Sequence, residues 1–467
     1  MAVSFSYPKK RSKTVSFNAF DLGADSRIAS ELAPWRAADS YNFKLFDGAL
    51  KDSFGVKELK WDAFDGTLKE ITGEVIKKAF YYKLFDDAEN LRDDRLLALC
   101  ESGNLYEAKL NSGSGYELIR SGVPLSATGV NYRFNDRDAF VLSEDGSLAV
   151  YDGEEFSVHE APRITSMCTH GERLFVTTGG EKTTLWFSDN FDPTNWYVSL
   201  DEAGFIDFRD GLGQVNKVIE FDGRVYIFRD VGVNRLQGYM KQQDFYVESV
   251  SVPREKIFAS TVTDCGKNIV YLTGGGFYSF DGYNAVRILP ELKGYIAGVD
   301  NETSHGAYHN GSFYCSFRLK IGGKVENRIL CYNVADGSYY LVKGFSVDEM
   351  LHVVEMGDKL LFVTEGKLGE MSDTAKYFGK TLKKRWVNNA GNFGIAKVKT
   401  LKKIELVSKG DCEVTISSDF GERKLAIDGS RAARSVSVGL KGNEFSIAFE
   451  SRTVGAEISD VDLVFAY

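Results

Sequence analysis

The sequence predicts an all-β chain: a β-propeller of six or seven blades followed by a C-terminal antiparallel β-sandwich or barrel. Glycine contributes 46 of the 467 residues and aromatic residues 13%, with only 7 prolines, which suits many short strands joined by tight turns. A polar turn followed by an apolar strand recurs at the spacing of a propeller blade, about 40–45 residues. This period stops near residue 380. We therefore expect an N-terminal arm and latch (1–60), a propeller (61–379) and a C-terminal β-domain (380–467).

The N-terminal part is expected to hold an arm, a short helix and a hairpin. Residues 1–14 are polar and basic, which predicts an arm that is flexible or ordered by a partner. A short helix is expected near residues 34–40. Residues 42–54 contain two short strand-like stretches around Asp47-Gly48, a dipeptide typical of tight hairpin turns. Residues 68–78 are expected to form a strand or a short helix.

The repeats are anchored by seven polar turns, each followed by an apolar strand. The anchors are Asp94, Asp136, Gly171, Gly223, Gly266, Gly311 and Gly357. A second strand follows each, and most units show a third, outer strand. The spacings of 35 and 52 residues are irregular, so one unit can be degenerate and both six and seven blades stay open. The last unit lacks a clear outer strand before Lys380, and we expect the hairpin at 42–54 to supply it and latch the ring.

Charge is distributed unevenly along the chain. The net charge is −9, and residues 380–467 carry 15 Lys/Arg against 11 Asp/Glu, which leaves −13 for residues 1–379. This acidic balance excludes general nucleic-acid adhesion. One segment has eight basic residues and no acidic one: Lys380, Lys383, Lys384, Arg385, Lys397, Lys399, Lys402 and Lys403. It is either a solvated face or linker, or a surface that contacts an acidic neighbouring subunit.

Candidate chemistry is sparse. His305 and His309 are four residues apart, but the Gly-rich, strand-like sequence around them disfavours a helical metal site, and His352 has no carboxylate or cysteine companion. The segment 188–196 is predicted to be a turn that folds on itself, with Trp196 packing on a neighbouring blade. No phosphate loop, Gly-x-Ser-x-Gly elbow or Cys/His signature is present. We therefore expect no enzyme, no cofactor and no metal.

The six cysteines are scattered without a C-x-x-C pair and are expected to be buried thiols of a protein folded in a reducing cytosol. The N-terminus lacks the apolar region of a secretory signal, and no run approaches the length of a membrane span.

Several segments resemble bacteriophage tail structural proteins, and the layout is most similar to the tail nozzle or DNA-stabilisation proteins of short-tailed phages. The segments are Gly23-Ala-Asp25, the Ala-Pro-Trp-Arg…Asn42 stretch, Asp47-Gly-Ala-Leu50, residues 187–196, 213–228 and 233–238. Arg36 and the basic segment do not match the family's pattern. The resemblance implies a ring of copies, commonly sixfold, that extends or closes the DNA channel and retains packaged DNA. It also implies tail adaptor or portal-side proteins and fibre or needle proteins as neighbours, and residence in the virion tail and, during assembly, the host cytoplasm.

The acidic balance of residues 1–379 fits this expectation, because like charge would keep passing DNA from adhering to a channel wall. The rival hypothesis is a carbohydrate-binding or glycan-hydrolysing β-propeller, since carboxylates are numerous and an inward-facing pair would suffice for hydrolysis.

Overall fold

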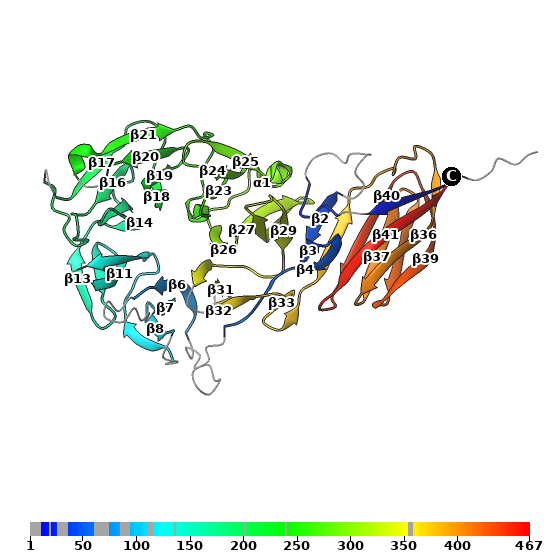
Figure 1. Cartoon of the computed structure of the whole chain (residues 1–467), viewed down its shortest axis with the longest axis horizontal. Coiled ribbons are helices and arrows are strands. Elements are labelled where there is room, and N and C mark those ends of the chain that lie inside the picture. Colours follow the sequence, from blue (N-terminus) through cyan, green and yellow to red (C-terminus); the bar gives the residue numbers. More distant parts are fainter. Residues whose placement is uncertain are drawn as a thin grey trace, which may run out of the picture. The chain divides into compact units, whose positions relative to one another are not determined.

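The computed structural model (Figure 1) describes residues 11–17, 20–25, 36–59, 74–84, 94–110, 115–134, 137–199, 202–238, 241–353 and 358–467. Its contacts define two compact units. Unit 1 comprises Met1–Lys57, Arg328–Phe345 and Met371–Tyr467, and unit 2 comprises Glu58–Asn327 and Ser346–Glu370. The three sequence-based segments 1–60, 61–379 and 380–467 stay a prediction about domains. The compact units differ from these three segments because unit 1 contains both the N-terminal and the C-terminal segment.

Unit 2 is a β-propeller, and its first five blades are complete four-stranded antiparallel sheets. The first is β6 (Ile76–Tyr82), β7 (Arg95–Cys100), β8 (Leu105–Lys109) and β9 (Glu117–Arg120). The second is β10 (Gly129–Phe134), β11 (Arg137–Glu144), β12 (Ser147–Tyr151) and β13 (Phe156–Glu160). The third is β14 (Ile164–His170), β15 (Arg173–Thr178), β16 (Thr184–Phe187) and β17 (Gly204–Asp207). The fourth is β18 (Val215–Phe221), β19 (Arg224–Arg229), β20 (Val233–Gln237) and β21 (Tyr246–Val250). The fifth is β22 (Thr263–Asp264), β23 (Ile269–Thr273), β24 (Gly276–Phe280) and β25 (Ala285–Ile288).

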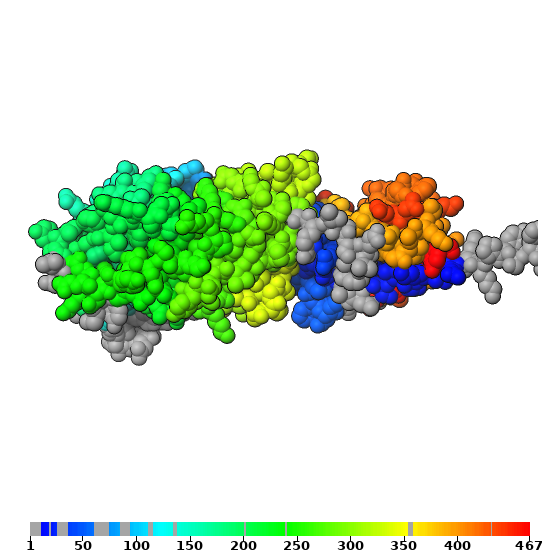
Figure 2. Space-filling view, turned by 90° about the horizontal axis from the view of Figure 1, so that it is seen from above, coloured from blue at the N-terminus to red at the C-terminus, as the bar shows by residue number. Residues whose placement is uncertain are grey.

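The sixth and seventh blades end in strands that continue into unit 1. The sixth has β26 (His305–His309), β27 (Ser312–Ile321) and β28 (Lys324–Asn333), and the seventh has β30 (Glu349–Val353), β31 (Lys359–Thr364) and β32 (Lys367–Ser372). Helices in the described part are short: η1 (Gln242–Asp244), η2 (Ala259–Thr261), η3 (Pro290–Leu292) and α1 (Lys293–Ile296). Figure 2 shows the side chains of the third to fifth blades, in green, packed into a continuous surface.

Burial explains why the second strand of each blade was so visible in the sequence. All residues of β7, β15 and β23 are buried, because neighbouring blades cover both faces of the sheet. A strand covered on both sides needs a continuous apolar run. The outer strand β13, in contrast, is polar and mostly exposed. Each of the seven turn anchors precedes the second strand of a blade, so the sequence located all seven blades. Two of the anchors, Asp136 and Gly357, lie outside the described residues.

Apolar clusters between successive blades close the ring. Blade one packs on blade two through Leu97 and Phe140, and similar clusters join blades two to five. Phe277 of blade five lies 5.2 Å from Phe317 of blade six, measured between ring centroids. The last joint returns to the start, with Ala98 of blade one and Leu361 of blade seven in one cluster. Seven blades therefore form a closed ring.

Unit 1 contains a β-sandwich, as the sequence predicted, but it is built from both ends of the chain. One sheet has the order β3 (Phe43–Phe46), β4 (Ala49–Asp52), β41 (Glu457–Ala466), β36 (Lys399–Lys409) and β39 (Ser430–Gly442), with β1 (Ser12–Phe17) also on β41. The other has the order β2 (Ala37–Tyr41), β35 (Lys384–Asn388), β40 (Phe445–Ser451), β37 (Cys412–Ser418) and β38 (Gly421–Ile427). Further strands of unit 1 are β5 (Gly55–Glu58), β29 (Tyr339–Val342), β33 (Lys376–Tyr377) and β34 (Lys380–Thr381).

Aromatic side chains fill the sandwich core. Trp386 is fully buried, and the centroids of Phe20 and Phe449 lie 5.1 and 5.8 Å from its ring. The indole N–H of Trp386 donates to the carbonyl oxygen of Asp21 at 2.9 Å. The N-terminal chain thus contributes both apolar rings and a hydrogen-bond acceptor to a core whose other half comes from the last 85 or so residues.

Two predictions about the N-terminal part are wrong, and a third is tested only in part. Of the arm predicted for residues 1–14, residues 1–10 lie outside the described part, and Ser12–Phe17 is a strand paired with β41. The described part of the predicted helix, residues 36–40, is extended because β2 pairs with β35. The hairpin at 42–54 joins the sandwich through β4 and β41, and the strand beside β32 in the sheet of blade seven is the following one, β5. The chain reaches blade seven just after the hairpin, where the Leu59 N–H donates to Leu368 O at 3.3 Å.

The prediction for residues 68–78 is confirmed as a strand from Ile76, and residues 68–73 lie outside the described part. All six cysteines are buried, and none of them forms a disulfide bond. Within the described residues, no helix is long and apolar enough to cross a membrane.

Candidate functional site

The structure divides the eight predicted contact residues into three groups. Lys380, Lys397 and Lys402 are exposed. Lys383, Arg385 and Lys403 are partly exposed and form ion pairs within the chain, the first two with Glu450 and the third with Glu405. Lys384 and Lys399 are buried.

The two buried lysines correct the prediction of a contiguous basic contact surface. The Lys384 ammonium lies 2.8 Å from a carboxylate oxygen of Asp52 and donates to the Thr453 carbonyl. The Lys399 ammonium donates to the carbonyls of Ile395 and Asn443, and burial lowers its pKa. Both follow the alternation of a strand, in which every second residue faces the core. They hold the sandwich together and cannot contact another subunit.

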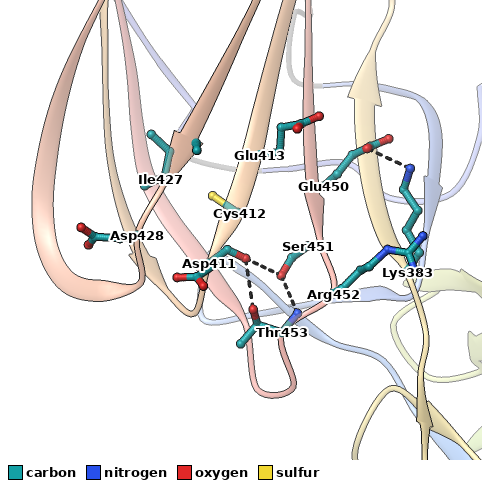
Figure 3. A pocket seen from close by; sticks show the side chains of 11 residues that line it. Lys383, Asp411, Cys412, Glu413, Ile427, Asp428, Glu450, Ser451, Arg452 and Thr453 are labelled. Carbon is teal, nitrogen blue, oxygen red and sulfur yellow. Dashed lines mark hydrogen bonds and ion pairs between the residues drawn. The ribbon is translucent and has the colours of Figure 1, made fainter.

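One predicted residue, Lys383, lines a groove at an edge of the five-stranded sheet (Figure 3). The groove has a volume of about 630 Å³. Its walls come from β37, β38, β40 and the turns beside them: Lys383, Asp411, Cys412, Glu413, Ala426, Ile427, Asp428, Glu450, Ser451, Arg452 and Thr453. Four carboxylates and two cations therefore face a small apolar floor.

Hydrogen bonds hold the groove in one shape. Ser451 Oγ donates to the Asp411 carbonyl at 2.7 Å, and the Thr453 N–H donates to Ser451 Oγ at 3.1 Å (Figure 3). Burial would raise the pKa of Glu450, but the hydrogen bonds from Lys383 and Arg385 outweigh it and lower that pKa. Glu450 is therefore a carboxylate neutralised by two cations.

Neither the Cys412 thiol nor the Ser451 hydroxyl of the groove is activated as a nucleophile in this structure. Burial raises the pKa of the Cys412 thiol, so this cysteine is protonated at neutral pH. No histidine lines the groove, and the Ser451 hydroxyl is engaged with a backbone carbonyl. Fixed charges of both signs around a small apolar floor suit binding of a polypeptide segment with complementary charges.

A second polar group lies around the axis of the propeller. Lys78, Lys217, His305 and Glu349 come from the innermost strands of blades one, four, six and seven and interact electrostatically. Glu349 accepts from the Ala79 N–H at 2.9 Å, and Lys78 donates to the Ala127 carbonyl at 2.8 Å.

Burial shifts all four of these groups toward neutrality. It raises the pKa of Glu349 to about 7 and lowers the pKa values of Lys78 and Lys217. Burial, with the two lysine charges, lowers the pKa of His305 to about 4. The sequence analysis missed this group, because its members are far apart in the chain. The sequence feature that could have revealed the group is a polar residue inside the strand that precedes a turn anchor.

The segments that carry the family resemblance serve structural purposes. Asn42, only 1% exposed, donates from Nδ2 to the carbonyls of Lys343 and Lys383 at 2.8 and 2.7 Å, and its Oδ1 accepts from the Lys343 N–H. Its φ of 63° lies in the left-handed region, which asparagine tolerates better than most residues.

The turn at 188–196 folds on itself, as predicted. The Asp189 N–H donates to the Asn195 carbonyl at 3.1 Å, and Asp192 accepts from the backbone and hydroxyl of Thr194. Trp196 packs against the cluster between blades two and three. The acidic residues of this segment therefore cap their own turn.

The fold and the groove define a seven-bladed β-propeller protein with a β-sandwich made from both chain ends. No family model matches the sequence, and no curated protein matches it. The chain is similar to a structure of BBS1N in complex with ARL6DN, with a TM-score of 0.45, 11% identity and coverage of 68% of this chain and 96% of that one. It is also similar to Kluyveromyces lactis Hsv2 (TM-score 0.33, 7% identity, coverage 58% and 97%). A structure of YCF48 bound to D1 peptide gives a TM-score of 0.31 and 10% identity, with coverage of 53% and 93%.

These similarities carry no functional argument. The propeller assignment is shown by the sheets and by the clusters that close the ring.

Proposed function

We propose that this chain is a non-enzymatic structural protein of a bacteriophage virion tail, a nozzle or hub subunit that extends or closes the DNA channel and retains packaged DNA. The proposal rests on the structural role of the segments that resemble phage tail proteins. Asn42 joins three backbone groups from distant parts of unit 1, and residues 188–196 close a rigid turn in unit 2. These residues fix the local backbone conformation, as a structural subunit of a tail requires.

The chemistry of the described residues supports the same proposal. The groove offers binding and no activated nucleophile. The charge of −13 over residues 1–379 would repel DNA and let it pass without adhesion.

In the assembled tail, copies of this chain form a ring, sixfold by the family resemblance. Tail adaptor or portal-side proteins and fibre or needle proteins contact its ends, in the virion tail and, during assembly, the host cytoplasm. The groove with Lys383 and Arg452 is a candidate contact between subunits.

Imaging and mass measurement test this proposal directly. Purified protein, alone and mixed with the products of neighbouring genes, is examined by negative-stain microscopy and mass photometry. We expect rings with a coaxial channel and contacts above about 1,000 Å². Arg452→Glu should weaken ring formation, whereas Lys441→Glu, on an exposed site outside the groove, should not. A protein that stays monomeric in every mixture contradicts the proposal.

One observation favours the rival function in its binding form. Tyr197, Phe191 and Phe205 of blade three are 73%, 64% and 47% exposed, and Phe205 lies 5.1 Å from the Trp186 ring. Exposed aromatic rings can stack on sugar faces. A glycan array with wild type and Tyr197→Ala tests this function. Selective binding that the substitution abolishes would support a carbohydrate-binding protein, and hydrolysis of a reporter glycan would establish a glycosidase.

A further inference from the structure

We propose a binding site for a divalent transition-metal cation, of the Zn²⁺ class, formed by His309, His352 and Asp358. The ligand atoms of these three side chains all lie within 4.8 Å of one another. His352 Nε2 is 2.5 Å from Asp358 Oδ1, and His309 Nε2 is 3.7 Å from Asp358 Oδ2. The two imidazole rings are 5.2 Å apart, measured between centroids.

The propeller brings these residues together by its topology. His309 is the last residue of β26, His352 lies near the end of β30, and Asp358 immediately precedes β31. β26 and β30 are the innermost strands of neighbouring blades, so their exit ends lie at the same end of the ring. The cluster therefore spans the joint between blades six and seven, inside unit 2.

The arrangement agrees with one sequence-based interpretation and corrects another. His305 and His309 lie on a strand, as expected, and four residues of strand separate them by about 13 Å, so they do not form a metal pair. His352 does have a carboxylate companion, six residues further along the chain.

A buried ring with an unsatisfied nitrogen is an independent sign of a missing ligand. The His309 side chain is 7% exposed, and its Nε2 is 2.7 Å from the Asp358 carbonyl oxygen. Its Nδ1 is buried with no hydrogen-bond partner among the described residues. Buried polar atoms are usually satisfied, and an unpaired one commonly marks an absent water or ion.

The donor set selects the class of cation. Two imidazoles and one carboxylate match zinc sites that have three protein ligands and an open fourth position. Ca²⁺ and Mg²⁺ prefer oxygen ligands throughout. His352 and Asp358 are 36% and 56% exposed, so solvent can supply the remaining ligand. The nearest basic residue in the chain, Lys359, is paired with Glu370 at 2.5 Å, which keeps its charge occupied beside the cluster.

The bound ion would act as a clamp between blades. It would replace the His352–Asp358 hydrogen bond by bonds that include His309 of the neighbouring blade. Because it binds the folded ring only, it should raise the melting temperature by an amount that grows with the ratio of the free ion concentration to the Kd. This inference is independent of any role in a phage tail.

Metal titration of the full-length protein tests the site. Chelator-treated protein is titrated with ZnCl₂ by calorimetry and with CoCl₂ by visible absorption. We expect one equivalent of each, a Co²⁺ spectrum of nitrogen and oxygen ligands, and no competition from 1 mM Ca²⁺. His352→Ala and Asp358→Asn should each weaken Zn²⁺ binding at least tenfold and remove the Zn²⁺-dependent rise in melting temperature. Both positions are exposed enough that the variants should fold, which circular dichroism verifies.

His159→Ala is the matched control, since His159 lies on β13 of blade two, hydrogen-bonded to Ser157. It should bind as wild type does. Wild-type protein that binds no Zn²⁺, or cluster variants that bind with wild-type affinity, would overturn the proposal.

Discussion

The propeller and the sandwich obtain a stable core in opposite ways. Blades one to six pair strands that follow one another in the chain, so the core of each is assembled locally. The sandwich pairs Thr14 with Val464 and Leu50 with Ile458, so its core depends on segments from the two ends of the chain. The two units also place polar groups differently. Partly buried charged side chains of the propeller gather around its axis, whereas in the sandwich the buried Lys384 pairs with Asp52 of a distant segment.

Removal of residues 1–60 should have the largest effect, and should destabilise the sandwich more than the propeller. The deletion removes β1, β2, β3 and β4 from both sandwich sheets and Leu59 from the cluster that closes the ring. We expect insoluble protein, or protein that lacks the unfolding transition of the sandwich, as measured by differential scanning calorimetry. An unchanged thermogram would show that the N-terminal strands are dispensable.

Trp386→Ala tests the aromatic core of the sandwich. The side chain is fully buried between Phe17, Phe20 and Phe449, so its truncation should cost about 3–5 kcal/mol of unfolding free energy. Urea unfolding followed by circular dichroism measures the loss. If the propeller transition moved by the same amount, the two cores would be one cooperative unit.

Glu107→Ala is the counterpart in the propeller. Glu107 accepts from Arg95 at 3.0 Å and from Tyr151 at 2.7 Å, and all three side chains are buried. Removing the carboxylate leaves the Arg95 cation uncompensated, which should cost about 3–5 kcal/mol. Urea unfolding of Glu107→Ala, with Glu117→Ala on the exposed part of β9 as the control, measures it. Equal stability of the two variants would mean that solvent reaches the buried arginine.

Asn42→Ala should have an intermediate effect. It leaves the backbone groups of Lys343 and Lys383 without their partners, at about 1–3 kcal/mol for each buried group left unpaired. Asn42→Gly, which accepts the positive φ without strain, isolates the hydrogen bonds from the backbone conformation. If both Asn42→Ala and Asn42→Gly were as stable as wild type, the hydrogen bonds of Asn42 would not contribute to stability.

Glu349→Gln should give the smallest effect, which is a change in how the free energy of unfolding depends on pH. Burial raises the pKa of Glu349 from its ordinary 4.5 to about 7, so the folded state binds this proton more tightly than the unfolded state. Its contribution to stability is fully present below pH 4.5 and is lost as the pH rises through 7.

Urea midpoints at pH 6.5 and 8.5 measure this dependence. His305, with a pKa lowered to about 4, destabilises the fold only below its ordinary value of 6.5 and leaves this window clear. Wild type should lose stability between the two values and the glutamine variant should lose less. Parallel behaviour of the two proteins would show that Glu349 does not titrate there.

The repeat could be predicted from the sequence because a strand that is buried on both faces has a continuous apolar run. The apolar second strands and the turns before them located every blade. Except for β6 of blade one, the innermost strands were missed because polar residues interrupt their apolar pattern. In β18, the polar residues Asn216, Lys217 and Glu220 lie between buried residues that recur at every third position, a pattern that does not predict a strand.

The remaining features were beyond a single sequence for a topological reason. The pairing of β1 with β41 and of β2 with β35 joins residues hundreds of positions apart, and no local pattern encodes such a choice. The groove and the His309–His352–Asp358 cluster likewise arise where different strands meet. Among the eight predicted contact residues, the sequence could not show that the strand alternation would bury Lys384 and Lys399.

The pairing of the first strand with the last sets an order of events during synthesis. Ribosomes add about 5–20 residues per second, so residue 14 waits about 20–90 s for its partner at position 464. The blades can close in sequence over that interval, whereas the sandwich is completed only after β41 has been synthesised. Until then β1, β4 and β36 lack the strand with which all three pair.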